Sequence, residues 1–242
     1  MGRETELRLT GALLLAAAAL AWVITSNRMA GMDMGRGTDL GGLGWFAGVW
    51  AVMIAAMMLP SLVPMAGAYA REGRPGGTAL FVAGYLGLWV IAGIVAWALV
   101  QSVGSLDPAI LRWSDGGRYV AGGVIAAAAL YELTPPKARC LRHCRDSRLL
   151  VADWRRGPAG ALRMGLKQGG YCIGSSWALM AALFALGVMS IAWMVVIAAL
   201  IAIEKLVPRP YLASRGAAAL LLALAAGVAF FPEQLPGLAI PG

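Results

Sequence analysis

Two of the three cysteines and the single histidine lie together in the segment YELTPPKARCLRHCR, residues 131–145. If this segment is helical beyond its two prolines, Cys140 and Cys144 lie one turn apart on one face, with His143 beside them. Thiolate and imidazole together suit Cu(I) or Zn(II), and the adjacent arginines favour the thiolate form. Cys172, expected on the same side of the membrane, is a candidate fourth ligand. The alternative is that these cysteines only pack on a helix at the membrane surface.

Methionines provide a second set of soft donors. Met29, Met32 and Met34 fall within MAGMDMG, between two apolar segments, and Met57 and Met58 lie inside the second of those segments. Thioethers can hold Cu(I) without forming disulfides, so the first three are candidates for capturing a metal ion outside the membrane. The alternative for every one of them is ordinary apolar packing.

Three ionisable residues border apolar segments. Glu132 precedes Thr134-Pro135, and Glu204 and Lys205 occur in IAIEKLVP. Charged groups near a membrane segment are costly and indicate function, but near the end of a segment they can also be stabilised by pairing or snorkelling. An ion-binding role and a structural pairing with loop arginines both remain open for these residues.

The composition requires an apolar environment. The chain has 242 residues, of which 60% are hydrophobic and 13% charged, whereas a soluble domain carries about 25% charged residues. The sequence therefore predicts an all-α polytopic membrane protein, with residues 1–242 forming one integral membrane domain in the lipid bilayer. The basic residues lie in loops between apolar segments, which excludes nucleic acid as a partner and is typical of membrane topology.

About seven transmembrane helices are expected, because the chain contains seven apolar segments. They lie at 9–25, 43–63, 79–100, 119–133, 171–207 (divided near 187–190 into two) and 217–231. The segment 134–170 contains nine Lys and Arg against two acidic residues, which predicts a basic cytoplasmic loop. Counting outward from it places the N-terminus inside and the C-terminus outside. The second segment is expected to end at Pro60 and Pro64, because proline breaks helices.

Several linked motifs resemble a bacterial family of predicted metal-binding integral membrane proteins, a domain of unknown function. The motifs are MIAAMMLPS, GYLGLWV, YELTPPKARCLRHCR, GYCIGSSWALMAALFALGVMSIAWM and IEKLVP, and together they cover about residues 45–210. The resemblance implies a multi-pass protein of the bacterial inner membrane. It carries over a set of site positions: Met57, Met58, Cys140, Cys144, Cys172, Glu204 and Lys205.

The chain departs from the family pattern at one place. Where the family has a cysteine pair before tryptophan, this sequence has Ser175 and Ser176, and serine is a poor ligand for soft metals. Either metal binding uses only the remaining cysteines, or this member has taken another role.

These observations favour a membrane-embedded protein that binds, delivers or transports a soft metal ion, with copper as the leading candidate. The alternative is a non-catalytic accessory or assembly subunit of a larger membrane protein complex. A thiol-redox protein using Cys140 and Cys144 is a third hypothesis, weakened by the reducing cytoplasm. No glycine-rich phosphate loop or serine-nucleophile elbow is found in a fitting context, so the sequence favours a role other than catalysis.

Overall fold

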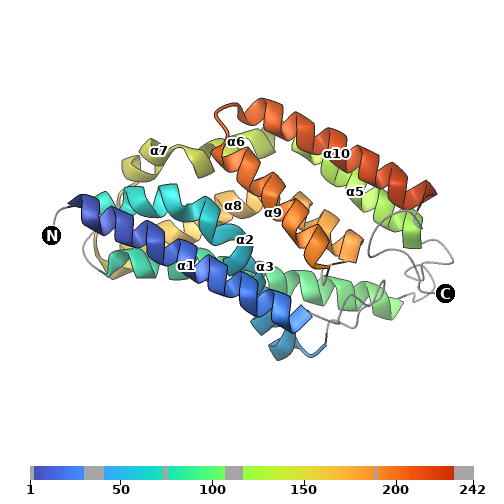
Figure 1. Cartoon of the computed structure of the whole chain (residues 1–242), viewed down its shortest axis with the longest axis horizontal. Helices are drawn as coiled ribbons and strands as arrows, with labels where there is room; N and C mark the ends of the chain where they lie inside the picture. The colour runs from blue at the N-terminus through green and yellow to red at the C-terminus, as the bar shows by residue number, and fades with distance from the viewer. Residues whose placement is uncertain (1–2, 30–40, 73–75, 107–116, 188–189, 232–242) are drawn as a thin grey trace.

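The computed structural model describes residues 3–29, 41–72, 76–106, 117–187 and 190–231, and all regular structure within these ranges is helical (Figure 1). This confirms the all-α prediction for the described part of the chain. In chain order the helices are α1 (Arg3–Met29), α2 (Leu43–Glu72), α3 (Gly77–Leu106), α5 (Arg118–Glu132), α6 (Pro135–Arg145), α7 (Ser147–Ala152), α8 (Gly157–Gly187), α9 (Ile191–Leu206) and α10 (Pro210–Phe230).

Five of the described helices, α1, α2, α3, α8 and α10, are long and apolar enough to cross a membrane. This is compatible with a membrane protein. Helices α5 and α9 have 15 and 16 residues, or roughly 22–24 Å at about 1.5 Å per residue. A bilayer core is about 30 Å thick. Seven spans with the N-terminus inside therefore remain a prediction.

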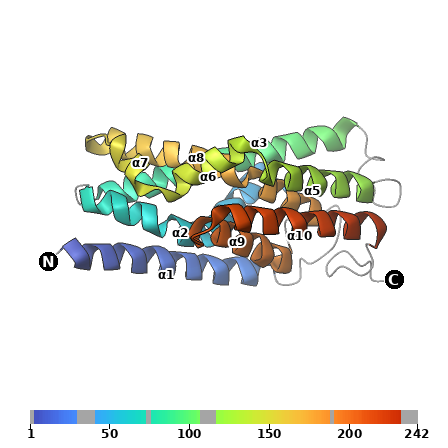
Figure 2. The same ribbon diagram turned by 90° about the horizontal axis from the view of Figure 1, so that it is seen from above.

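The helices pack in neighbouring pairs. Helix α1 lies along α2, α3 along α8, and α5 along α10, as Figures 1 and 2 show from two directions. Glycines bring α3 and α8 close together: a Cβ at Gly165 would overlap the backbone carbonyl of Phe81, and one at Gly84 would meet the carbonyl oxygen of Leu162. Such small residues permit the close backbone approach by which helices associate in lipid.

Two helices differ from the expected segments. Helix α2 continues through Pro60 and Pro64 to Glu72, so the expectation that it ends at the prolines was wrong. Interior proline is tolerated where neighbouring helices provide a packed environment. Helix α8 begins at Gly157, so much of the expected loop 134–170 is helical. The predicted division of the long apolar segment is confirmed, because α8 ends at Gly187 with φ 107°.

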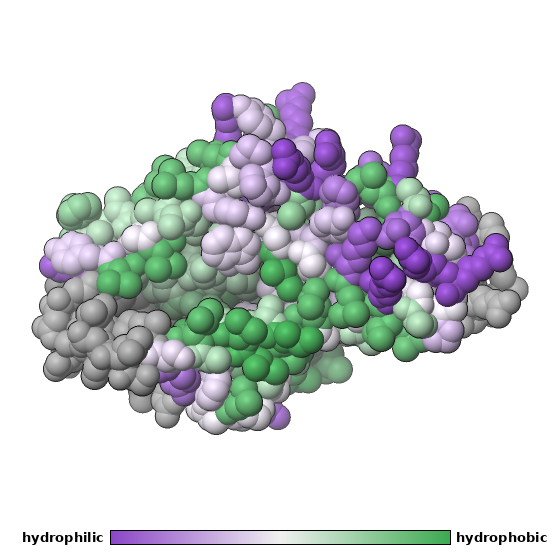
Figure 3. Space-filling view, turned by 180° about the vertical axis from the view of Figure 1, so that it is seen from behind, coloured by the Kyte–Doolittle hydropathy of each residue, from purple (hydrophilic) through white to green (hydrophobic). Residues whose placement is uncertain are grey.

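The surface of the molecule has distinct hydrophilic and hydrophobic regions. In Figure 3, hydrophilic residues gather toward one end and one edge of the face shown, and hydrophobic residues cover most of the remainder. Many apolar side chains of α1, α3 and α10 are exposed, including Leu13, Leu20, Leu99 and Phe230. Exposed apolar residues along long helices fit contact with lipid.

Candidate functional site: a buried sulfur cluster

Helix α6 brings the first cysteine segment against the interior of the molecule. Its first two residues are prolines, which suit the start of a helix because their missing N–H groups have no partner there. Lys137, Leu141 and Cys144 are its buried residues, spaced by four and three positions along one face. This face packs against α8 and α9. Cys144 is therefore directed inward.

Three sulfur atoms meet in the interior, and we call this group, formed by Met58, Cys144 and Cys172, the sulfur cluster. The Sγ of Cys172 lies 3.9 Å from the Sδ of Met58. The thiols of Cys144 and Cys172 are within hydrogen-bonding reach of each other. Met58 is wholly buried, and Cys172 and Cys144 are 1% and 6% exposed. Residues from α2, α6 and α8 thus form one soft-donor site.

Polar side chains from two further helices complete the surroundings of the cluster. The Nζ of Lys205, on α9, lies 2.9 Å from the Sγ of Cys172, 3.9 Å from the Sδ of Met58 and 3.4 Å from the Oγ of Ser61. The hydroxyl of Tyr85, on α3, lies 2.9 Å from the same Cys172 sulfur. An ammonium at this distance stabilises negative charge on sulfur. The surroundings of Cys172 therefore favour its metal-binding form.

The two serines that replace cysteines in the sequence pattern lie beside the cluster. The Oγ of Ser175 is 3.7 Å from the Sγ of Cys144 and donates a hydrogen bond to the carbonyl oxygen of Cys172. Ser176 contacts Ser175 at 3.4 Å between hydroxyl oxygens. A sulfur atom at position 175 would therefore be a neighbour of the sulfur cluster.

A second polar centre, which we call the carboxylate centre, consists of Glu132, Lys137 and Glu204. The Nζ of Lys137 pairs with the Oε2 of Glu132 and lies 2.5 Å from the Oε1 of Glu204. The hydroxyl of Ser214 donates a hydrogen bond of 2.8 Å to the same Glu204 oxygen. The guanidinium of Arg145 contacts the backbone carbonyl oxygen of Glu204. Four helices, α5, α6, α9 and α10, are connected here, which supports the structural interpretation of Glu132 and Glu204.

The contacts of Cys140 and His143 are with residues outside the sulfur cluster. The Sγ of Cys140 packs against Gly174, where an added Cβ would come within 2.6 Å of it. The ring of His143 stacks on Tyr171 with 4.3 Å between ring centroids. The described residues contain no group of three His, Cys, Asp or Glu arranged to hold a metal ion.

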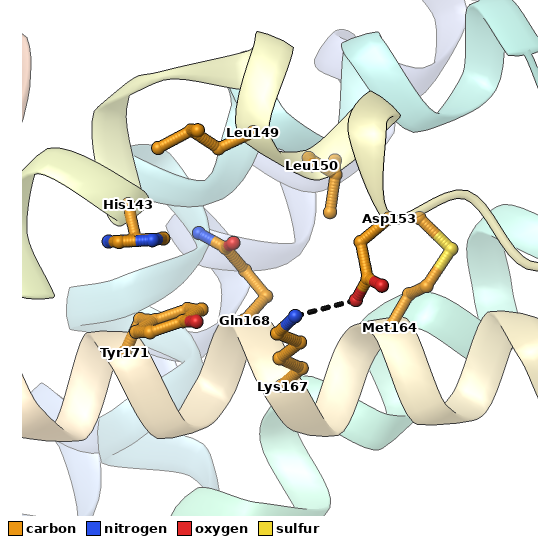
Figure 4. A pocket seen from close by; sticks show the side chains of 8 residues that line it. All are labelled: His143, Leu149, Leu150, Asp153, Met164, Lys167, Gln168 and Tyr171. Carbon is orange, nitrogen blue, oxygen red and sulfur yellow. Dashed lines mark hydrogen bonds and ion pairs between the residues drawn. The ribbon is translucent and has the colours of Figure 1, made fainter.

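The histidine lines a cavity of about 90 Å³ between α6, α7 and α8. Figure 4 shows His143 above Tyr171, the amide of Gln168 between them and α7, and the Lys167–Asp153 ion pair of 2.6 Å on the other side. Leu149, Leu150 and Met164 also line the cavity. The residues of the sulfur cluster do not line this cavity, although two lining residues, His143 and Tyr171, directly precede Cys144 and Cys172 in the chain.

The predicted methionines have different outcomes. Met58 belongs to the sulfur cluster, and Met57 is buried in the apolar core. Met29 is the last residue of α1, and the structure does not describe its side chain. Met32 and Met34 lie outside the described residues, so metal capture there stays a prediction.

Burial and neighbouring groups change the acidity of residues on α6. Burial raises the pKa of the Cys140 thiol. The pKa of Cys144 is also raised, first by the neighbouring Cys172 thiol and then by burial, while Lys205 acts in the opposite direction. Burial lowers the pKa of Lys137, and the charge of Glu204 opposes this. Both α6 cysteines are therefore held toward the neutral thiol form, and a soft metal ion would have to displace the thiol proton to bind there.

Sequence reasoning missed Lys137, Tyr85 and Ser61 as site residues. Lys137 was counted only among the topology-setting basic residues, yet its side chain is fully buried. Its spacing of seven from Cys144 was the available signal, because two turns of helix place both on one face. Tyr85 stands within the GYLGLWV motif, and Ser61 stands one turn after Met58.

Two thiols and a thioether are suited to a soft monovalent ion, because Cu(I) prefers thiolate and thioether ligands. Within the described residues, the helical bundle and this donor set define a helical, membrane-compatible protein with a buried group of soft donors.

A family model described as PpoB2, copper chaperone, matches residues 47–228. The chain belongs to this family, and that membership supports a copper-related function. The matched range contains α2 except its first residues and continues to α10, so it includes the whole sulfur cluster. No curated protein and no solved structure gives a significant match.

Proposed function

We propose that this protein is a membrane-embedded copper chaperone that holds Cu(I) at the sulfur cluster. The observation that carries the proposal is the convergence of Cys144, Cys172 and Met58 from three helices on one buried position. Family membership supports copper as the ion. Cu(I) accepts sulfur coordination, whereas a structural Zn(II) site almost always has four protein ligands. The cluster offers three sulfurs.

The bilayer location is part of the same proposal. Residues 137–167, which run from α6 through α7 into α8, carry the nine basic residues that predict a cytoplasmic position. The sulfur cluster, formed in part by α6, would then lie near the cytoplasmic face of the bacterial inner membrane. A chaperone must hand its ion to a recipient, so a membrane protein partner is included in the proposal. The predicted outer methionines would capture the ion.

A Cu(I) titration of the purified full-length protein tests the proposal. The wild-type protein should bind Cu(I) in competition with a chromogenic Cu(I) chelator. The double variant Cys144→Ser with Cys172→Ser should lose this binding, since serine is a poor ligand for soft metals. Cys140→Ser is the matched control, because Cys140 lies on the same helix but outside the cluster.

Two results would contradict the proposal. One is a wild-type protein that leaves all copper on the chelator. The other is equal copper binding by the wild type and the Cys144/Cys172 double variant, with both proteins folded by circular dichroism and gel filtration.

A further inference from the structure

The sulfur cluster contains a positive charge of its own. The Nζ of Lys205 lies 2.9 Å from the Sγ of Cys172 and 3.9 Å from the Sδ of Met58, so the ammonium already contacts two of the three sulfurs. The residue is 8% exposed. We propose that Lys205 is the residue that makes this site selective for a monovalent soft ion over a divalent one. The inference rests on the proposed function of the sulfur cluster.

The carboxylates nearby make their direct contacts with other groups than Lys205. The carboxylates of Glu132 and Glu204 pair with Lys137, and the guanidinium of Arg145 contacts the backbone of Glu204. The remaining polar neighbours of the cluster are hydroxyl groups, those of Tyr85 and Ser61 at the contacts described above. The ammonium of Lys205 contacts sulfur and hydroxyl groups instead, so it is a charged group in direct contact with the sulfur cluster.

Charge neutrality then decides between ions. Two thiolates and one ammonium together carry one negative charge, and a monovalent ion makes the loaded site neutral. A divalent ion would leave one positive charge in the interior. Uncompensated buried charge is strongly unfavourable. Removal of Lys205 would reverse the relation, because two thiolates alone are neutralised by a divalent ion.

The lysine can make room for the ion without losing its proton. The hydrogen bond from Nζ to the Cys172 sulfur breaks, metal–sulfur bonds form at Cys144 and Cys172, and both thiol protons pass to solvent. The oxidation state of the metal and of sulfur does not change. The flexible side chain carries the ammonium toward the Oγ of Ser61, which already lies 3.4 Å away. It stays close enough to neutralise the loaded site.

The wild-type protein provides the first test. Ag(I) and Cd(II) are both soft, thiol-binding ions, and they differ in charge. Each is titrated into full-length protein in competition with a small thiol ligand of known affinity. Ag(I) should bind with Cys144 and Cys172 as ligands, and the wild-type protein should bind Cd(II) at least about a hundredfold more weakly than Ag(I), because a divalent ion leaves a buried positive charge.

The variants give the second test. In Lys205→Gln, the ratio of Cu(I) affinity to Zn(II) affinity should fall at least about tenfold, since a unit charge within about 4 Å has a large effect at a partly buried site. Lys205→Arg keeps the charge and should keep the ratio close to that of the wild type. Lys167→Gln is the matched control, because Lys167 is an exposed lysine on α8.

The outcomes distinguish failure of the proposed copper-binding function from failure of ion selectivity by Lys205. If wild-type protein binds neither Ag(I) nor Cu(I), the proposed function fails and the inference fails with it. If it binds Cu(I) through the two cysteines but takes Cd(II) equally well in the wild type and Lys205→Gln, the proposed function stands and selectivity by Lys205 is overturned. The wild-type comparison of Ag(I) with Cd(II) does not depend on the folding of any variant: equal binding of the two ions also overturns the inference.

Discussion

The molecule contains two buried lysines whose surroundings differ in kind. Lys137 lies between two carboxylates, whereas Lys205 lies between sulfur atoms and hydroxyl groups. The carboxylate centre is made of hard, oppositely charged partners on four helices. The sulfur cluster has soft donors and a positive charge. The first arrangement connects four helices, and in our proposal the cation of the second moves aside for the bound ion. Glu204 and Lys205 are adjacent in sequence, so one turn of α9 contributes to both.

The largest expected effect is at the carboxylate centre. Lys137→Met removes the ammonium and leaves two buried carboxylates without it, which should lower the free energy of unfolding by about 3–5 kcal/mol. Denaturant unfolding in detergent, followed by circular dichroism, measures this. Glu132→Gln and Glu204→Gln, introduced together in the Lys137→Met background, should restore part of the loss. An unfolding curve for Lys137→Met that matches the wild type would remove the proposed distinction between the two centres.

The sulfur cluster should respond in affinity. Ser175→Cys places a thiol next to Cys144, since the hydroxyl oxygen now lies 3.7 Å from that sulfur. An additional soft donor should raise Cu(I) affinity by roughly tenfold or more, measured by competition with a chromogenic chelator. Ser176→Cys is the matched control, because the side chain of Ser176 contacts Ser175. Unchanged affinity in Ser175→Cys would place the bound ion away from Cys144.

A smaller effect is expected where the carboxylate centre receives a neutral hydrogen bond. Ser214→Ala removes the 2.8 Å hydrogen bond to the Oε1 of Glu204, which should cost about 1–2 kcal/mol of stability. The same unfolding experiment detects it. Copper affinity should not change, because Ser214 is not in contact with the sulfur cluster. A fall in copper affinity with unchanged stability would show that the two centres are not separate.

The smallest effect concerns the cysteine outside the cluster. Burial raises the pKa of the Cys140 thiol, and alkylation requires the thiolate. In the Cys144→Ser, Cys172→Ser background, maleimide labelling should therefore be slow at neutral pH and accelerate only above the ordinary thiol range, which is near pH 8.5. A rate that is already maximal at pH 7 would contradict this, and would indicate that the neighbouring arginines control the thiol.

Much of this organisation could be predicted from the sequence because it depends on local spacing. The all-α class and the turn at Gly187 follow from apolar periodicity and glycine conformation. Cys172, Met58 and Lys205 were candidates by residue type and position, the family resemblance carried over the same positions, and the structure brings them together.

Other features depend on contacts between distant segments and could not be predicted this way. Lys137 resembles any other basic loop residue until α6 packs against α9 and buries it. His143, placed with the cysteines by sequence distance, instead stacks on Tyr171 because α8 extends upstream to Gly157. Pro60 and Pro64 were expected to end a helix, but the packing of α2 against its neighbours continues past them.

X-ray absorption spectroscopy of the copper-loaded, full-length protein tests the central claim most directly. The account predicts Cu(I) with sulfur-only nearest neighbours, and loss of sulfur scatterers in Cys172→Ser, while Cys140→Ser leaves the spectrum unchanged. A first shell dominated by nitrogen or oxygen, or a spectrum unaffected by Cys172→Ser, would contradict a copper site at Met58, Cys144 and Cys172.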